Sequence, residues 1–172
     1  MRKIVLTLFI GLLLLGCSSK NDMETKGTMH MNHKMFQSVD EKQALLVQEG
    51  KDKRYCTRCG MDLVKFYKTS HTADAEKETK KYQYCSIHCL AEHLGEGITL
   101  KNPKVVDVNS LELISIADAF YVVGSKKRGT MSKISKYAFS NIKDAKIFQA
   151  QYGGEIMDFN KALEKAKEDF IR

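Results

Sequence analysis

The residues of this chain with the most evident chemistry are four cysteines arranged in two close pairs. Cys56 and Cys59 lie in the stretch YCTRCGM, and Cys85 and Cys89 lie in the stretch YCSIHC. Thiolates bind soft metal ions, and C-x-x-C pairs are typical of metal knuckles as well as of redox dithiols. The spacing predicts that two turns come together to form a sulfur-rich metal site.

A methionine next to the first pair favours copper over zinc. Met61 follows Gly60 and offers a thioether at the same corner as the thiols. Structural zinc sites use cysteine and histidine, whereas copper(I) also accepts methionine sulfur, so Cu(I) is the expected metal and Zn(II) the alternative. Met131, in the polar stretch RGTMSK, is a further candidate ligand from a distant loop. For both methionines the alternative is packing in the core.

The N-terminal segment holds a second group of soft ligands, in the polar stretch MHMNHKM. Its members are Met29, His30, Met31, His33 and Met35. A mixture of methionine and histidine suits copper in either oxidation state, and no core is expected nearby; the alternative is compositional drift in a linker. His88, next to Cys89, is a candidate for a secondary role at the metal. His71 and His93 are expected to face solvent.

The N-terminus has the form of a bacterial lipoprotein signal. Arg2 and Lys3 precede an apolar run over residues 4–15, which is too short to cross a bilayer with ease. The stretch LLGC resembles a lipobox, in which cleavage precedes the cysteine, so Cys17 is expected to carry lipid. A plain signal peptide is the alternative. Ser18 favours sorting to the outer membrane, with the protein on its periplasmic side.

Composition and compartment narrow the function. The formal charge of +7 is spread over residues of both signs, without an arginine-rich stripe with interleaved aromatics, so nucleic-acid binding is not favoured. No serine elbow, phosphate-cradling glycine loop or carboxylate pair beside a histidine indicates an enzyme. Four cysteines in an exported domain usually predict two disulfides, whereas their spacing here favours a metal, and the two signals conflict.

The elements that must position the cysteines follow from the hydrophobic pattern. We expect strands over residues 63–69, 81–85 and 104–108, a polar connection over 70–80, and a helix over 86–97 with Ser86 as its cap. The second half repeats this order, with strands over 119–125, 134–139 and 155–159, a connection over 126–133, and a helix over 140–154. A last helix is expected over 160–172, with Asn160 as its cap.

The two halves can be aligned, which indicates an internal duplication. Lys81, Tyr82 and Tyr84 match Lys136, Tyr137 and Phe139 at a constant offset of 55 residues. Chance similarity of two amphipathic units is the alternative. At the same offset Cys85 and Cys89 correspond to serine and aspartate, so the repeat does not need thiols to fold. This difference favours a functional role for the cysteines.

We therefore predict an α+β fold of duplicated ββαβ units. The expected segments are a signal peptide (1–16), a lipid-anchored Met/His-rich tether (17–45), a first ββαβ unit with the cysteine metal site (46–110), and a second ββαβ unit with a C-terminal helix (111–172).

The lipobox and the stretches YCTRCGM, YVVGSKKRGTM, SKYAF and YGGEIMDF together resemble the NosL family of copper-chaperone lipoproteins, over residues 54–159. The resemblance implies a duplicated ββαβ fold, copper(I) binding, and delivery to nitrous oxide reductase through the NosD/NosF/NosY membrane machinery. It implies metal roles for Cys56, Cys59 and Met61, and for Met131 in its loop. The stretch YCSIHC is also similar to the TRASH/YHS pattern. Many NosL sequences lack it, so four thiols in one site and a copper port beside a structural pair both stay open.

The sequence as a whole predicts a lipid-anchored copper(I) chaperone that is not an enzyme. One alternative is a structural zinc or disulfide-stabilised interaction module. The other is a thiol oxidoreductase, which is disfavoured because the first cysteine pair leads through Gly60 and Asp62 into a predicted strand, whereas a thioredoxin-like pair opens a helix.

Overall fold

The computed structural model describes residues 35–168. Cys17 and the tether residues Met29, His30, Met31 and His33 lie outside this range, as do the expected signal peptide and residues 169–172. Within the described range, no helix has both the length and the apolar character needed to cross a bilayer.

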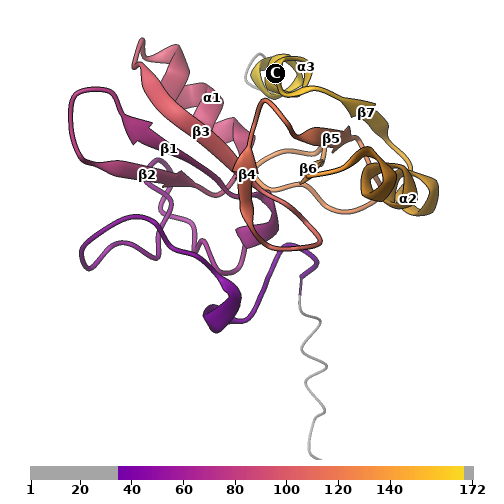
Figure 1. Ribbon diagram of the computed structural model, residues 1–172, viewed down its shortest axis with the longest axis horizontal. Helices are drawn as coiled ribbons and strands as arrows, with labels where there is room; N and C mark the ends of the chain where they lie inside the picture. The colour runs from indigo at the N-terminus through magenta and orange to yellow at the C-terminus, as the bar shows by residue number, and fades with distance from the viewer. Residues whose placement is uncertain (1–34, 169–172) are drawn as a thin grey trace, which may run out of the picture. The chain divides into compact units, whose positions relative to one another are not determined.

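The first repeat is a four-stranded antiparallel sheet with one helix. The strands run in the order β2-β1-β3-β4 across the sheet. They are β1 (His71–Ala75), β2 (Lys81–Tyr84), β3 (Leu100–Val106) and β4 (Leu113–Ser115). Helix α1 (Ile87–Gly95) connects β2 to β3 (Figure 1).

The second repeat is a three-stranded antiparallel sheet with the order β6-β5-β7. Its strands are β5 (Phe120–Val123), β6 (Lys136–Phe139) and β7 (Glu155–Met157). Helix α2 (Ile142–Tyr152) connects β6 to β7, and helix α3 (Phe159–Glu168) follows β7.

The two sheets share one topology. In each, the first strand pairs with the second and the third, and a helix joins the second strand to the third. This arrangement confirms the predicted α+β class and the duplicated ββαβ unit. Strand β4 is an addition to the first repeat that the sequence did not predict. The described residues, 35–168, belong to one compact unit, and the exact segment boundaries given above stay predictions.

A shared core joins the repeats where helix α1 lies beside helix α3 (Figure 1). Ile87 and Ala91 of α1 contact a cluster that includes Tyr121 of β5 and Ala162 and Ala166 of α3. Both α3 alanines are fully buried, and their small side chains let the helices approach closely. The position of α1, which carries one cysteine pair, therefore depends on the second repeat.

The first strand of the first repeat lies elsewhere than expected. Residues 63–69 form turns and a short 3-10 helix, Tyr67–Thr69, because the Asp62 carboxylate accepts hydrogen bonds from the amides that follow it and bends the chain. Strand β1 begins at His71, inside the stretch expected to be a polar connection. His71 and Thr72 are buried there although both are polar.

The start of the last helix also differs from expectation. Helix α3 begins at Phe159, and the Asp158 carboxylate accepts a hydrogen bond of 2.9 Å from the amide of Lys161. Asp158 therefore takes the capping role that the sequence assigned to Asn160. A short 3-10 helix, Glu41–Gln43, precedes the first cysteine pair.

Candidate metal centre

The four cysteines converge on one point. The sulfur atoms of Cys56, Cys59, Cys85 and Cys89 all lie within 4.8 Å of one another. The Sγ atom of Cys85 lies 3.5 Å from that of Cys59 and 3.7 Å from that of Cys89. Four thiolates around one ion at a metal–sulfur distance of ~2.3 Å lie ~3.8 Å apart, so these spacings suit a single metal ion. The geometry thus favours one four-thiol site over two separate ones.

The first cysteine pair lies on a tight hairpin. The amide of Leu63 donates to the carbonyl of Arg54 at 2.9 Å, and the amide of Cys56 donates to the carbonyl of Met61 at 2.9 Å. The amide of Gly60 closes the turn on the carbonyl of Cys56 at 3.0 Å, with a φ of +71° that favours glycine. This hairpin therefore holds the two cysteines of the pair close together, with their sulfur atoms within 4.8 Å of each other.

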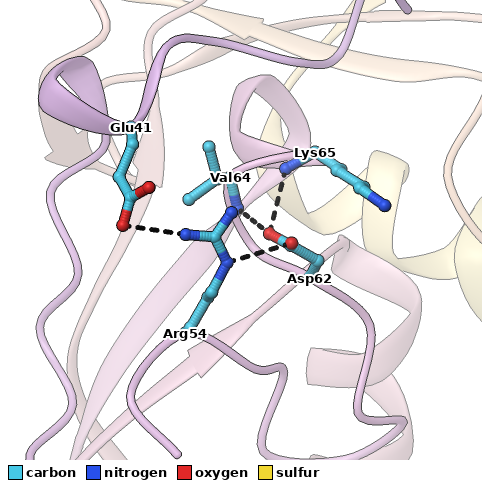
Figure 2. Close-up of polar contacts among 5 residues, drawn as sticks. All are labelled: Glu41, Arg54, Asp62, Val64 and Lys65. Atoms are coloured by element: carbon cyan, nitrogen blue, oxygen red, sulfur yellow. Dashed lines mark hydrogen bonds and ion pairs between the residues drawn. The ribbon is translucent and has the colours of Figure 1, made fainter.

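A salt bridge fixes the far end of this hairpin (Figure 2). Arg54 Nε donates to Asp62 Oδ2 at 3.0 Å, and Arg54 Nη1 pairs with Glu41 at 2.9 Å. The second oxygen of Asp62 accepts from the amides of Val64 at 2.9 Å and Lys65 at 3.3 Å. Asp62 thus fixes both the side-chain pairing and the bend that follows the metal-binding turn.

The second pair is held at the junction of β2 and α1. The amide of Thr57, within the first pair, donates to the carbonyl of Gln83 on β2 at 3.0 Å, which sets the two pairs in register. Cys85 follows β2 directly, and Cys89 lies in the first turn of α1. Ser86 occupies the predicted N-cap position, but its hydroxyl makes no capping bond and is buried without a hydrogen-bond partner within the described chain.

The thiols differ in exposure and in acidity. Cys56, Cys85 and Cys89 are at most 4% exposed, whereas Cys59 is exposed. Hydrogen bonds from Cys85 and Cys89 lower the pKa of Cys56 far below that of a free thiol. The pKa values of Cys85 and Cys89 are raised, chiefly because each is hydrogen-bonded to Cys56. Cys56 is therefore the thiolate that its neighbours stabilise, and thiolates are the form that binds metal.

Met61 lies beside the thiols and is partly buried. Its Sδ atom is 4.0 Å from the Sγ atom of Cys85. The thioether therefore joins the four thiols in one group of five sulfur atoms, as the spacing of YCTRCGM predicted. Met61 also packs against the apolar cluster around the cysteines, so its side chain contributes both packing contacts and a sulfur atom to this site.

Met131 makes no contact with the sulfur group within residues 35–168, but the loop that carries it is linked to Cys85 by hydrogen bonds. The side chain is 50% exposed and the residue has a φ of +59°, an uncommon conformation for methionine. The hydroxyl of the preceding Thr130 lies 2.8 Å from that of Thr69, which donates to the carbonyl of Cys85 at 2.7 Å. Its role as a ligand stays a prediction.

Of the tether's candidate ligands, only Met35 lies in the described range, where it is 41% exposed. Two residues later, the side-chain amide of Gln37 donates to the carbonyl of Arg128 at 2.6 Å. The ring of Phe36 makes an edge contact with Tyr137 and lies under the ammonium of Lys127. The start of the described chain is therefore fastened to the loop between β5 and β6.

The histidines lie deeper than expected. His88 is buried in α1, next to Cys89. His93, expected to face solvent, is 5% exposed and its Nδ1 lies 2.7 Å from the hydroxyl of Tyr84. His71, also expected to be exposed, is buried between Thr69 and Tyr121, and burial lowers its pKa to about 4.

The residues that support the cluster were not found from sequence. Gln83 is fully buried and bonds the segment before the first pair, through Leu45, Val47 and Gln48. Thr69 bridges the two repeats. One feature of the sequence could have indicated Gln83. It lies in a predicted β strand two residues before Cys85, and a polar side chain that is buried there needs a hydrogen-bond partner.

The comparisons with known proteins point in one direction. A family model described as NosL matches residues 47–166. The crystal structure of the copper chaperone NosL from Shewanella denitrificans is similar to this chain, with 26% sequence identity and a TM-score of 0.53. The match covers 66% of this chain and 92% of that one. No curated protein matches the chain.

Proposed function

The chain belongs to the NosL family, and from this premise we propose that it is a copper(I) chaperone that binds and passes on its metal without acting as an enzyme. The observation that carries the proposal is the group of five sulfur atoms formed by the four cysteines and Met61. The similar protein from Shewanella denitrificans is itself named a copper chaperone.

The chemistry of this group suits a soft monovalent ion. Thiolates and thioethers are the ligands that copper(I) prefers among those that proteins offer. Binding must displace protons from the thiols, and the hydrogen bonds from Cys85 and Cys89 that lower the pKa of Cys56 reduce this cost for the first thiolate. A thioether carries no charge and holds the ion less firmly than a thiolate does. Met61 therefore makes the group better suited to a metal that is later released.

The proposal extends to the anchor and the recipient. The stretch LLGC supports a lipid on Cys17, which would hold the protein on the periplasmic side of a bacterial membrane. Membership of the family supports delivery to nitrous oxide reductase with NosD/NosF/NosY-type machinery. Cells lacking this chain should then make copper-deficient reductase, restored by the wild-type chain and not by Cys56→Ser. If Cys17→Ser restores copper to the reductase without associating with the membrane, the lipid anchor is not needed for delivery and that part of the proposal fails.

An anaerobic competition titration tests the metal directly. The full chain, reduced and in detergent, is titrated with Cu(I) against bicinchoninate, in parallel with Zn(II). We expect the wild type to withdraw copper from the chelator and Met61→Ala to bind it about tenfold more weakly, or roughly 1.4 kcal/mol. Met157→Ala, a partly buried methionine of the other core, is the matched control and should not change the affinity. Adding Met131→Ala tests whether the loop contributes a ligand.

Zinc is the alternative metal, and one observation favours it. Four thiols at 3.5–4.8 Å also suit a tetrahedral zinc site, and three of them are buried as in structural sites. A structural zinc module predicts tight Zn(II) binding by four thiolates and no effect of Met61→Ala. That result, with no copper withdrawn from the chelator, would reject the copper proposal.

A further inference from the structure

One thiol of the cluster differs from the other three in its access to solvent. The side chains of Cys56, Cys85 and Cys89 are covered, whereas Cys59 is exposed although its sulfur lies 3.5 Å from that of Cys85. An incoming ligand therefore reaches the cluster first on the side of Cys59. The following residue, Gly60, is also exposed and has open space where a Cβ would lie.

An arginine ties this exposed turn to helix α1. Arg58, directly before Cys59, pairs through Nη2 with Glu96 and, at 3.6 Å, with Glu92. Both glutamates are about half exposed, while the arginine side chain is 22% exposed. These two pairs, which we term the Arg58 clasp, are a side-chain link between the cysteine turn and the helix that carries Cys89.

The contacts that form the Arg58 clasp are weak. Arg58 Nε is buried without a hydrogen-bond partner in the described part of the chain, and an unpaired buried donor disfavours the closed position. Ion pairs with half-exposed carboxylates are weak, and each is worth at most a factor of about five in an equilibrium. The closed turn is therefore held by contacts that a docking partner can displace at small cost.

From these observations we infer that the Arg58 clasp holds Cys59 over the cluster, and that its release makes Cys59 the first ligand to leave copper during transfer. The inference rests on the proposed copper function. In the step, the bond between Cu(I) and the Cys59 sulfur breaks and a bond to a soft ligand of the acceptor forms. The copper stays Cu(I), and the freed Cys59 thiolate takes a proton from water. Arg58 is a positioning residue in this step and touches no metal.

The test measures the rate at which copper leaves the protein. The full chain in detergent is loaded anaerobically with Cu(I) and mixed rapidly with excess bicinchoninate, and the coloured complex is followed. We expect Arg58→Gln and Glu96→Gln each to speed the transfer about fivefold, and Arg58→Lys to stay closer to the wild type. Lys165→Gln, which removes an exposed ion pair on α3, is the control and should leave the rate unchanged.

A double-variant cycle assigns the effect to Cys59. Cys59→Ser should speed the transfer at least as much as Arg58→Gln, and adding Arg58→Gln to it should change nothing further, because the clasp then holds no ligand. An undiminished fivefold effect of Arg58→Gln in the Cys59→Ser background would overturn the inference, as would equal rates for all variants. The proposed function fails separately, if the wild type takes no copper from the chelator.

Alkylation supplies a readout that does not depend on the variants folding. The copper-loaded wild type is treated with iodoacetamide, and the modified cysteine is identified by mass spectrometry. We expect Cys59 to be modified before Cys56, Cys85 or Cys89, and faster when bicinchoninate competes for the metal. Modification of a buried cysteine first would contradict the assigned order of release.

Discussion

Thr69→Val removes the hydroxyl that joins the cysteine cluster to the second repeat, and the structure sets the size of the effect. Thr69 is 3% exposed, donates to the carbonyl of Cys85 at 2.7 Å and lies 2.8 Å from the hydroxyl of Thr130. Valine has nearly the same shape, so the change removes hydrogen bonds and leaves the packing. The carbonyl of a fully buried Cys85 would then lose this partner.

Losing a buried hydrogen bond and leaving its acceptor unpaired costs about 1–3 kcal/mol, so we expect Thr69→Val to lower the free energy of unfolding by about 2 kcal/mol. Urea unfolding of the reduced, metal-free chain, followed by circular dichroism, measures this difference. The matched control is Thr72→Val on β1, which is also buried, at 6% exposure, and makes no side-chain hydrogen bond within residues 35–168. The control should change the free energy by less than about 0.5 kcal/mol.

The outcome that refutes this reasoning is equal stability of Thr69→Val and the wild type. A control as costly as Thr69→Val would refute it too, since the effect would then reflect any buried threonine. A change in copper affinity accompanying the loss of stability would show that the bond also orients Cys85. Unchanged affinity would limit Thr69 to holding the repeats together.

Two further predictions concern the fold. His71 has a pKa of about 4 in the folded chain, below its ordinary 6.5, so its contribution to stability is full above pH 6.5 and is lost as the pH falls towards 4. At ~1.4 kcal/mol per pKa unit, the free energy of unfolding falls by about 3 kcal/mol. Urea unfolding between pH 7 and 4 should show this loss in the wild type and not in His71→Gln. Gly154→Ala should lower the free energy of unfolding by about 2–4 kcal/mol, because residue 154 has a φ of +96° and the new Cβ would lie 2.7 Å from the carbonyl oxygen of Val123. Gly50→Ala is the control: its φ is also positive, but the Cβ would lie in open space, so the cost should be about 1 kcal/mol. Equal costs for the two alanines would show that the contact with Val123 relaxes freely.

Periodic patterns predicted most of the elements because their causes are local. The helices α1 and α2 and the strands β2, β5 and β6 follow from apolar spacing and from glycines at their ends. The elements of the second repeat were predicted from their own patterns, and the alignment of the two halves then indicated the duplication. The prediction of a strand over residues 63–69 was wrong because a side chain, Asp62, competes for the backbone amides there, and apolar content alone does not reveal that competition.

The spacing of the two cysteine pairs predicted a metal site but left open whether the pairs form one site or two, and the contacts around them were not predicted. Arg58 and Glu96 are 38 residues apart, and Thr69 and Thr130 are 61 apart. Such pairs depend on how the sheets and helices pack, and no short pattern contains both partners. The burial of His71 has the same origin, because its partner Tyr121 belongs to the other repeat.

The fastening of Phe36 and Gln37 to the loop between β5 and β6 has a mechanical consequence. A pull on the chain ahead of Phe36 acts first on the Phe36 ring and on the bond between Gln37 and Arg128, both of which rest on the second repeat. The first repeat takes part of this force directly, because the carbonyl of Gln37 accepts a hydrogen bond from the amide of Lys68 at 3.1 Å and the Lys68 ammonium lies 4.7 Å from the centre of the Phe36 ring. A load applied at Phe36 and Gln37 is therefore shared between the two repeats before it reaches the hairpin of the first cysteine pair.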